Sequence, residues 1–338
     1  MPFSHILNRS LIFLFSVLVA TSASSAEKLT IFSGRSDKFV KPVIKAFTDT
    51  TGIEVVIHAG KSTGLLNKLK LEAGRTEADL YISNDAGNLQ KGVEFGLFQA
   101  LPGDLLAPIP ANYRDPKNNW VGISARARVL VVNKKAFSKD NIPTSIFDLA
   151  EPRFKDKLAI THSSNESFIA GTTVYMQLAG KQKTKQWLLG MKKNVAGKVY
   201  NKHSKIVKAV ASGKKSIGLV NHYYIYRFLA KHPDAPIKIV LPDQSSEGMG
   251  IAWNVAGIAI SKFSKHSEAA KKLIKFLISA EGQKIFANVN NEYPTRKGVA
   301  TAAAIPPLAT MKIADVGMVQ LGVLRNQTID LIESVGMP

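Results

Sequence analysis

Residues 28–57 read KLTIFSGRSDKFVKPVIKAFTDTTGIEVVI, and the hydrophobic pattern of this stretch changes twice. It begins with KLTIF and ends with IEVVI, two short apolar runs that predict strands. Between them Phe39, Val43 and Phe47 recur at four-residue spacing, which predicts the buried face of an amphipathic helix. A strand, a helix and a second strand in so short a stretch indicate a βαβ unit of an α/β fold.

The same alternation continues along the rest of the chain. Predicted helices begin near Phe168 and cover residues 63–73, 187–191, 206–211 and 268–279, and residues 280–283 cap a further short helix. Predicted strands cover residues 78–82, 125–133, 158–160 and 216–220. We therefore expect a mainly parallel sheet whose ligands bind beyond the carboxyl ends of the strands. Two turns at such ends, residues 33–36 and 83–87, are rich in small polar residues, although ordinary turns favour the same residues.

The first 26 residues have the layout of a secretory signal peptide. A weakly cationic start precedes the apolar run LIFLFSVLVA at residues 11–20, and small residues follow up to Ala26. A helix over this run rises about 15 Å, roughly half of the bilayer core, which argues against a membrane anchor. We expect cleavage after Ala26, export to the periplasm, and a remainder of about 310 residues, which favours two lobes over one.

The composition limits the classes of partner. The chain has no cysteine, which excludes disulfides, thiolate metal ligands and thiol nucleophiles. Its net charge of +20 comes from scattered lysines and arginines, which fits a solvated basic surface, an anionic ligand or an anionic membrane face. Export and the absence of a binding motif argue against a nucleic acid partner.

No catalytic motif is present in the sequence. The histidines lack HExxH spacing, and the chain has neither a Gly-x-Ser-x-Gly elbow nor a Walker loop. Acidic residues are few and scattered, which argues against a hydrolase with paired carboxylates. We therefore interpret the histidines as structural and do not expect an enzyme.

Tyr223 and Tyr224 follow the predicted strand at 216–220 after only two residues, Asn221 and His222. Fe³⁺ is a hard cation that prefers anionic oxygen, and tyrosinate supplies such an oxygen once a bound cation drives off the phenol proton. Consecutive side chains in a strand point to opposite faces, so both can reach one ion only where the chain turns into a helix. Taken alone, such a pair is more often a packing or surface feature than a metal site.

The chain resembles the periplasmic ferric-iron-binding proteins of ABC transporters over essentially its whole mature length. The segments that carry the resemblance are LTIFSGR (29–35), AFTDTTGIEV (46–55), GRTEADL (74–80), ARARVLVVN (125–133), NHYYIYRF (221–228), AEGQ (280–283) and EYP (292–294). The resemblance implies a type II periplasmic-binding-protein fold, in which hinge strands join two α/β lobes around a metal-binding cleft. We expect residues 27–125 and about 250–300 in the N-terminal lobe, and residues 126–249 and about 301–338 in the C-terminal lobe.

The resemblance also implies roles for individual residues. Tyr223 and Tyr224 look like the tyrosinate ligands of Fe³⁺, and Arg126 looks like the arginine that faces a synergistic anion. Positions that help to hold this anion in some members are Ser164, Asn201 and Asn221.

The sequence departs from the family pattern at several positions. One branch supplies a histidine and a glutamate from the N-terminal lobe, where this chain has Ser36 and Asn84, which we assign to the anion instead. Ser33-Gly34-Arg35 looks like the branch that uses carbonate or bicarbonate, with Arg35 on the anion. That branch often adds a third tyrosine before the helix near Phe168, where this chain offers Asn165 or Glu166 as replacement oxygen ligands.

The expected function is therefore capture of Fe³⁺ with carbonate or bicarbonate, and delivery to an inner-membrane ABC permease by a monomeric protein. The alternative is a binding protein of the same fold for another solute, such as an inorganic or organic anion, thiamine or a polyamine. A polyamine needs several carboxylates in the cleft, and thiamine needs aromatic stacking faces, of which only Trp253 and the tyrosines qualify.

Overall fold

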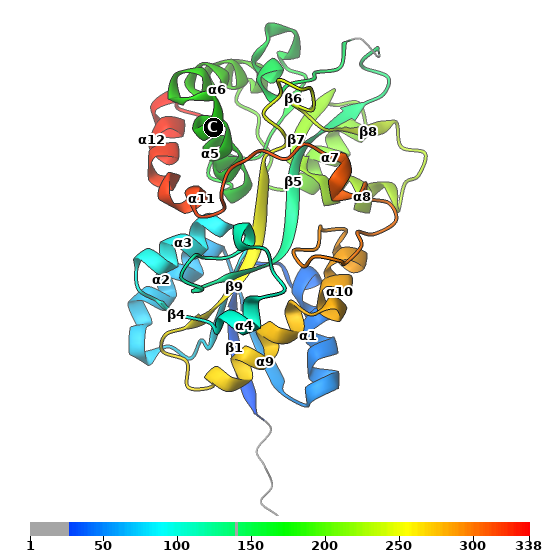
Figure 1. Cartoon of the computed structure of the whole chain (residues 1–338). Coiled ribbons are helices and arrows are strands. Elements are labelled where there is room, and N and C mark those ends of the chain that lie inside the picture. Colours follow the sequence, from blue (N-terminus) through cyan, green and yellow to red (C-terminus); the bar gives the residue numbers. More distant parts are fainter. Residues whose placement is uncertain (1–26, 139–140) are drawn as a thin grey trace, which may run out of the picture.

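The computed structural model describes residues 27–138 and 141–338 of the chain. The predicted signal peptide at residues 1–26 therefore lies outside the described residues. Figure 1 shows two lobes, one above the other in the view, joined by two long strands. A nine-stranded sheet runs through both lobes in the order β2-β1-β3-β9-β5-β7-β6, with β4 beside β9 and β8 beside β5.

The lower lobe in Figure 1 contains the predicted βαβ unit. β1 (Lys28–Ser33) pairs in parallel with β2 (Glu54–Ala59) and with β3 (Leu80–Ser83), and α1 (Asp37–Thr51) connects the first two. The predicted parallel unit is confirmed. α1 ends where Gly52 adopts a left-handed conformation with φ 72°, which glycine tolerates because it has no Cβ.

Further helices and one short strand complete the lower lobe. They are α2 (Ser62–Glu72), α3 (Ala86–Glu94), β4 (Phe98–Gln99), α4 (Gly103–Leu106), α9 (Ser267–Leu277) and α10 (Ala280–Asn290). α10 begins at the residues predicted to cap a short helix, 280–283, and extends to Asn290. Its apolar residues Phe286 and Ala287 continue the buried face, so packing extends the helix beyond its polar start.

The upper lobe contains the middle of the chain. Its elements are β6 (Leu158–Ala159), α5 (Glu166–Ala179), α6 (Lys181–Val195), α7 (His203–Ala211), β7 (Ile217–Asn221), α8 (His222–Leu229), β8 (Ile237–Val240) and, from the end of the chain, α12 (Arg325–Val335). β6 pairs in parallel with β7, whereas β7 and β8 both pair antiparallel with β5. The predicted helices and strands of this region are present, with boundaries that differ by several residues.

Two long strands, β5 (Val121–Asn133) and β9 (Trp253–Ser261), join the lobes. They pair antiparallel with each other, and β9 also pairs antiparallel with β3. Every residue of both strands is buried. The prediction of a mainly parallel sheet is therefore wrong for the centre of the molecule. There, β5 and β9, which carry the chain from one lobe to the other, pair antiparallel with the strands beside them.

The end of the chain connects the lobes a third time. α11 (Gln320–Val323) packs on α3 of the lower lobe, and α12 packs on α5 and α6 of the upper lobe. The approach to α3 is close, because a Cβ at Gly322 would lie 2.4 Å from the Cβ of Gln90. Beyond α12, the backbone N–H of Ser163 donates to the carbonyl of Pro338 at 2.8 Å.

Short 3₁₀ turns make up the remaining regular structure of the described residues. They are Ala73–Arg75, Ala111–Tyr113, Ile146–Ala150, Pro152–Phe154 and Leu308–Thr310. Within residues 27–138 and 141–338, no helix has both the length and the apolar character to span a membrane.

Candidate functional site

A cavity of about 840 Å³, here called the cleft, lies between the two lobes. Its walls include residues at or just beyond the ends of strands of both lobes, namely Gly34 after β1, Asn84 after β3 and Tyr223, two residues after β7. The carboxyl ends of strands are where ligands bind in open α/β sheets. The fold therefore places the cleft where the sequence predicted a ligand.

Tyr223 and Tyr224 lie in the first turn of α8, directly after β7 ends at Asn221. The change from strand to helix keeps the two rings together, with centroids 4.5 Å apart and an interplanar angle of 35°. Phe39 of α1 packs edge-on against both rings. Both tyrosines line the cleft, so the structure brings the two predicted metal ligands to one wall of the cavity.

The phenol of Tyr224 resists ionisation in the absence of a cation. Burial, and then the neighbouring Tyr223, raise the pKa of Tyr224 well above its usual value near 10. A bound trivalent cation reverses this preference, because it stabilises the ionised oxygen. Metal binding at Tyr224 therefore requires release of a proton.

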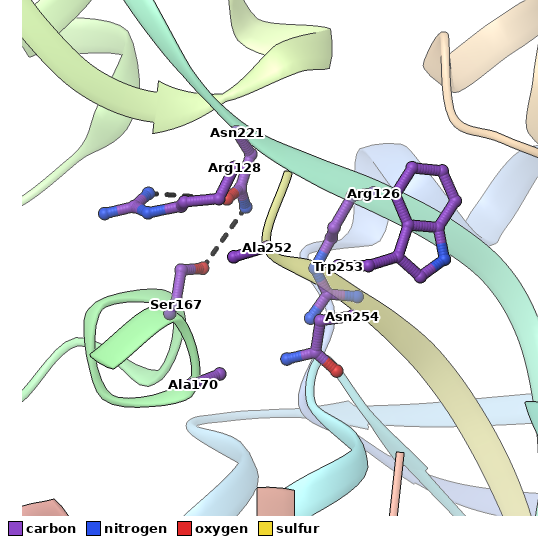
Figure 2. Close-up of a pocket in the computed structure, with 9 residues that line it drawn as sticks. Arg126, Arg128, Ser167, Ala170, Asn221, Ala252, Trp253 and Asn254 are labelled. Carbon is purple, nitrogen blue, oxygen red and sulfur yellow. Dashed lines mark hydrogen bonds between the residues drawn. The ribbon is translucent and has the colours of Figure 1, made fainter. Parts of the chain in front are cut away.

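Arg126 and Arg128 point to the same face of β5, since they are two residues apart on a strand. Within the described residues, neither forms an ion pair with a carboxylate. Burial lowers the pKa of both guanidinium groups, that of Arg128 to about 10, while nearby tyrosines oppose this shift. Figure 2 shows Arg128 bonded to Asn221, whose Oδ1 accepts from Nη1 at 3.4 Å. Of the two arginines Arg126 lines the cleft, so the cleft wall is positive at this point and suits an anion.

The resemblance placed Arg35 against the synergistic anion, but the structure places it outside the cleft wall. Its Nη2 donates to both carboxylate oxygens of Glu292 at 2.7 Å, and its Nη1 donates to Ser124 Oγ at 2.8 Å. Arg35 is 2% exposed and is not part of the cleft wall. The Glu292 carboxylate holds the guanidinium through two charge-assisted hydrogen bonds, which a solvent-exposed anion cannot displace. Arg35 and Glu292 therefore form a structural ion pair. Ser36, which precedes α1 at the surface, is also outside the cleft wall.

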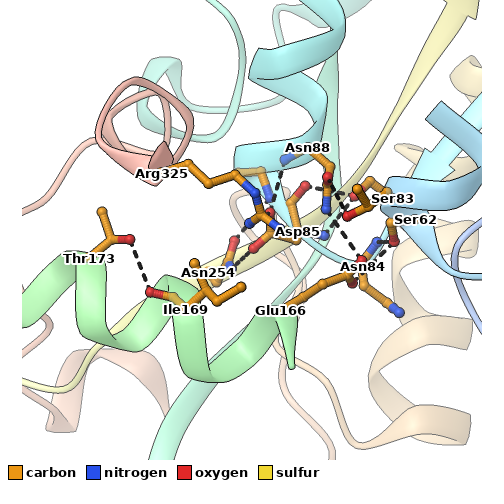
Figure 3. Close-up of polar contacts among 12 residues, drawn as sticks. Ser62, Ser83, Asn84, Asp85, Asn88, Glu166, Ile169, Thr173, Asn254 and Arg325 are labelled. Atoms are coloured by element: carbon orange, nitrogen blue, oxygen red, sulfur yellow. Dashed lines mark hydrogen bonds and ion pairs between the residues drawn. The ribbon is translucent and has the colours of Figure 1, made fainter. Parts of the chain in front are cut away.

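Glu166 is the first residue of α5 and lines the cleft. Its Oε2 accepts from Ser62 Oγ at 3.2 Å, and its Oε1 accepts from Asn88 Nδ2 at 3.3 Å (Figure 3). Both donors belong to the lower lobe, so this carboxylate bridges the lobes. Burial, and then the charge of Asp85, raise the pKa of Glu166 to about 6.

A second contact between the lobes lies beside Glu166. In Figure 3, Asp85 is held between Asn254, whose Nδ2 donates at 3.0 Å, and Arg325, whose Nη1 lies 3.5 Å from Oδ1. Arg325 begins α12 and also lines the cleft. The two carboxylates of this region are therefore shared between elements of both lobes.

The remaining predicted residues also meet at the cleft. Asn165 caps α5 by accepting the N–H of Ser167 at 3.0 Å, and Ser164 Oγ lies 2.9 Å from His162 Nδ1. The predicted positions that line the cavity are Asn84, Arg126, Ser164, Asn165, Glu166, Asn201, Asn221, Tyr223 and Tyr224.

The sequence did not identify several residues of the cleft wall. Tyr200 and His203 flank the predicted Asn201, and the ring of His203 lies 5.1 Å from that of Tyr224. His162 also lines the cleft, although we interpreted the histidines as structural. In the sequence, these three residues were distinguished only by lying close to Asn201 or Ser164, which the resemblance assigns to the anion site. Among the described residues, no group of three or more His, Asp or Glu side chains could hold a metal ion, which leaves the tyrosines as the distinctive donors.

Comparison with protein families and curated proteins places the chain among transport proteins. The family model of bacterial extracellular solute-binding proteins matches residues 76–316. The Fe(3+)-binding periplasmic protein of Serratia marcescens is 29% identical, and the match covers 94% of this chain and 93% of that protein. The major ferric iron-binding protein of Neisseria meningitidis is 27% identical over 96% of this chain and 97% of its own length.

Solved structures give the same result. Iron-bound HitA from Pseudomonas aeruginosa superposes with a TM-score of 0.86 at 28% identity, covering 92% of this chain and 100% of that chain. The Trichodesmium protein IdiA (FutA), in complex with iron and citrate, superposes with a TM-score of 0.81 at 30% identity and the same coverage. These neighbours are two-lobed periplasmic binding proteins, which confirms the predicted fold class.

Proposed function

Because the chain belongs to the bacterial extracellular solute-binding protein family, we propose that it captures ferric iron in the cleft between its lobes. It is a binding protein, not an enzyme. The observation that carries the proposal is the tyrosine pair at the start of α8, which lines the cleft of a chain whose relatives are named for ferric iron.

The proposed metal ligands are the phenol oxygens of Tyr223 and Tyr224. Two tyrosinates neutralise only two of the three charges of Fe³⁺, so a further anionic oxygen is needed. Glu166 is the carboxylate of the cleft wall and could supply it, and Asn165 beside it offers a neutral oxygen.

A carbonate-type anion is the other source of negative charge. Arg126 supports this proposal, because it is buried in the cleft wall and its Nη1 has no partner among the described residues. A guanidinium suits a planar anion, since it can donate two parallel hydrogen bonds. The neutral donors proposed to complete the anion site are Ser164, Asn201, Asn221 and Asn84.

The proposed cycle depends on movement of the two lobes. We assign residues 27–125 and about 250–300 to the N-terminal lobe, and residues 126–249 and about 301–338 to the C-terminal lobe. Closure about β5 and β9 would hide the ion from water. The closed monomer would then deliver iron in the periplasm to an inner-membrane ABC permease.

The composition of the cleft speaks against a polyamine as the solute. Glu166 is the only acidic side chain among the described residues of the cleft wall, whereas Lys61, Arg126 and Arg325 are basic. A polycation would meet net repulsion there. An anion or an anion-bound cation is the better electrostatic match.

The test of iron capture is a titration of the iron-free protein with Fe³⁺ and bicarbonate. Tyrosinate-to-iron charge transfer should colour the protein, and the variant Tyr223→Phe/Tyr224→Phe should lose both the colour and tight binding. Tyr226→Phe is the matched control, because Tyr226 lies on the same helix but not in the cleft wall. A double variant that remains coloured and binds iron as tightly as the wild type would refute the proposal.

A further inference from the structure

The positive charge of the chain is concentrated in one segment, and the proposed iron site does not use the lysines of that segment. Residues 167–233 contain 13 of the 45 lysines and arginines, and they contain no aspartate or glutamate. Twelve of these 13 residues are lysine. The segment therefore carries a net charge of +13, out of +20 for the whole chain.

α6 presents part of this charge on one side of the helix, here called the basic face. The basic face consists of exposed residues spaced three or four apart, which places them side by side on the helix surface, namely Lys181, Lys185, Leu189, Lys192 and Lys193. The opposite side of α6 is apolar and buried, and it includes Trp187, Leu188, Met191 and Val195. The packing of α6 therefore fixes which side faces the solvent.

α6 lies away from the proposed iron site. Figure 1 shows it on the outer side of the upper lobe, where it packs on α5 and α12. None of the five residues of the basic face lines the cleft. A partner bound to the basic face would therefore leave the cleft accessible.

The lysines of the basic face differ from those of the lower lobe in having no acidic partner. In α1, Lys45 pairs with Asp49, and in α2, Lys68 pairs with Glu72. No lysine of α6 forms an ion pair with any described residue, and the nearby Glu151 pairs with Arg153. Solvated helix surfaces usually mix the two signs of charge, and like charges four residues apart repel each other. An anionic partner would relieve this repulsion.

The composition of the basic face favours a lipid surface over an acidic protein. A lysine ammonium is a point charge on a flexible stem, whereas paired recognition of a carboxylate favours arginine. Leu189 is 41% exposed among the lysines, and Leu178, at the end of α5, is 39% exposed. On a bilayer, lysines keep their charged ends at the headgroups while their stems and a neighbouring leucine reach toward the acyl chains.

We propose that the basic face of α6 adsorbs to the anionic headgroups of a phospholipid bilayer. The headgroup phosphates supply the negative charge that this part of the chain lacks. The apolar side of α6 is buried in the upper lobe, so the helix rests on the headgroup layer and does not insert. The inference goes beyond iron capture and does not rest on it.

The experiment is co-sedimentation of residues 27–338 with lipid vesicles. The first 26 residues are left out, because their apolar run would bind lipid by itself. Vesicles of phosphatidylglycerol and phosphatidylethanolamine should carry the protein into the pellet at low salt, whereas vesicles of phosphatidylcholine alone should not. Binding should weaken as the salt concentration rises, because salt screens exposed charges.

The variant Lys181→Gln/Lys185→Gln/Lys193→Gln locates the binding on α6. Its affinity for anionic vesicles should fall about a hundredfold, since each lysine near an anionic surface contributes about fivefold. Leu189→Gln should also weaken binding. Its control is Leu71→Gln in α2, which removes a leucine that is 79% exposed on the other lobe and should have no effect.

The matched control for charge is Lys41→Gln/Lys45→Gln/Lys68→Gln. It removes the same net charge from exposed lysines of the lower lobe, each of which pairs with a carboxylate of its own helix. This control should bind anionic vesicles as the wild type does. Equal losses in the two triple variants would show that total charge acts, and would overturn the proposal.

Failure of the wild type to bind anionic vesicles would also overturn the proposal, and would leave an acidic protein as the partner of the basic face. None of these measurements involves iron, so they stand apart from the test of iron capture.

Discussion

Glu166 is the residue at which the two lobes and the proposed metal site meet. It belongs to α5 of the upper lobe, and it accepts hydrogen bonds from Ser62 and Asn88 of the lower lobe. Burial raises its pKa to about 6, so its ionised form is disfavoured in the iron-free protein. A bound cation would offset this cost, which links the charge of Glu166 to loading of the cleft.

We expect Glu166→Gln to stabilise the iron-free protein at neutral pH by about 1–2 kcal/mol. The folded pKa of about 6 lies above the ordinary 4.5, so the stability that Glu166 contributes is fully present below pH 4.5 and is lost as the pH rises through 6. Glutamine does not ionise and avoids this loss. Urea unfolding below pH 4.5 and at neutral pH measures the effect, and an equal gain at both values would contradict it.

Breaking the buried ion pair between Arg35 and Glu292 should cost far more stability than breaking an exposed pair. Replacing Arg35 with Met leaves a buried carboxylate without its partner, and we expect a loss of about 3–5 kcal/mol in the free energy of unfolding. Lys45→Met breaks the exposed pair with Asp49 and should cost less than about 1 kcal/mol.

Denaturant unfolding of both variants tests the ion-pair prediction. The double variant Arg35→Met/Glu292→Leu should recover part of the loss, because it removes the orphaned charge. A loss for Arg35→Met no larger than that for Lys45→Met would show that the pair is not structural.

The sequence could predict residues whose roles are local. Tyr223 and Tyr224 follow a strand directly, and the short turn that aligns them is visible as a change of pattern in the chain. Arg35 was misplaced because its partner, Glu292, is 257 residues away, and no local pattern records such a pairing. Arg128, His203 and Tyr200 were missed for the same reason, since only the packed lobes bring them to the tyrosine pair.

At the scale of elements, the contact between α11 and α3 fixes how the end of the chain crosses between lobes. Gly322→Ala places a Cβ 2.4 Å from the Cβ of Gln90, so we expect a loss of about 1–3 kcal/mol in stability. Gly64→Ala in α2 meets no atom within 4 Å and should be neutral or stabilising, as alanine usually is in a helix. Thermal unfolding compares the two, and similar melting temperatures would contradict the proposed close approach.

Helices and parallel strands near the start of the chain were predictable, because their periodic patterns are local. The antiparallel pairing of β5 and β9 was not predictable. A strand that is buried along its whole length has the same continuous apolar pattern whether it pairs parallel or antiparallel. β5 also begins earlier than predicted, at Val121 rather than Ala125. Its first residues pair with β9, which lies far away in sequence, and this pairing sets the boundary.

For the whole molecule, iron loading should draw the lobes together. Small-angle scattering of the wild type should show a smaller radius of gyration after addition of Fe³⁺ and bicarbonate, because the cleft between the lobes closes over the ion. The variant Tyr223→Phe/Tyr224→Phe provides the control and should not compact. An unchanged radius in an iron-loaded, coloured wild type would show that binding does not require closure.

The contact of Ser62 with Glu166 across the cleft has a practical consequence. The chain has no cysteine, so a thiol introduced at the exposed Lys61, beside this contact, would be the only place where a thiol-reactive dye attaches. A dye whose emission depends on polarity would report any change in the contact between the lobes at this point. Once the titration establishes iron capture, the labelled protein would serve as an optical reporter of iron binding.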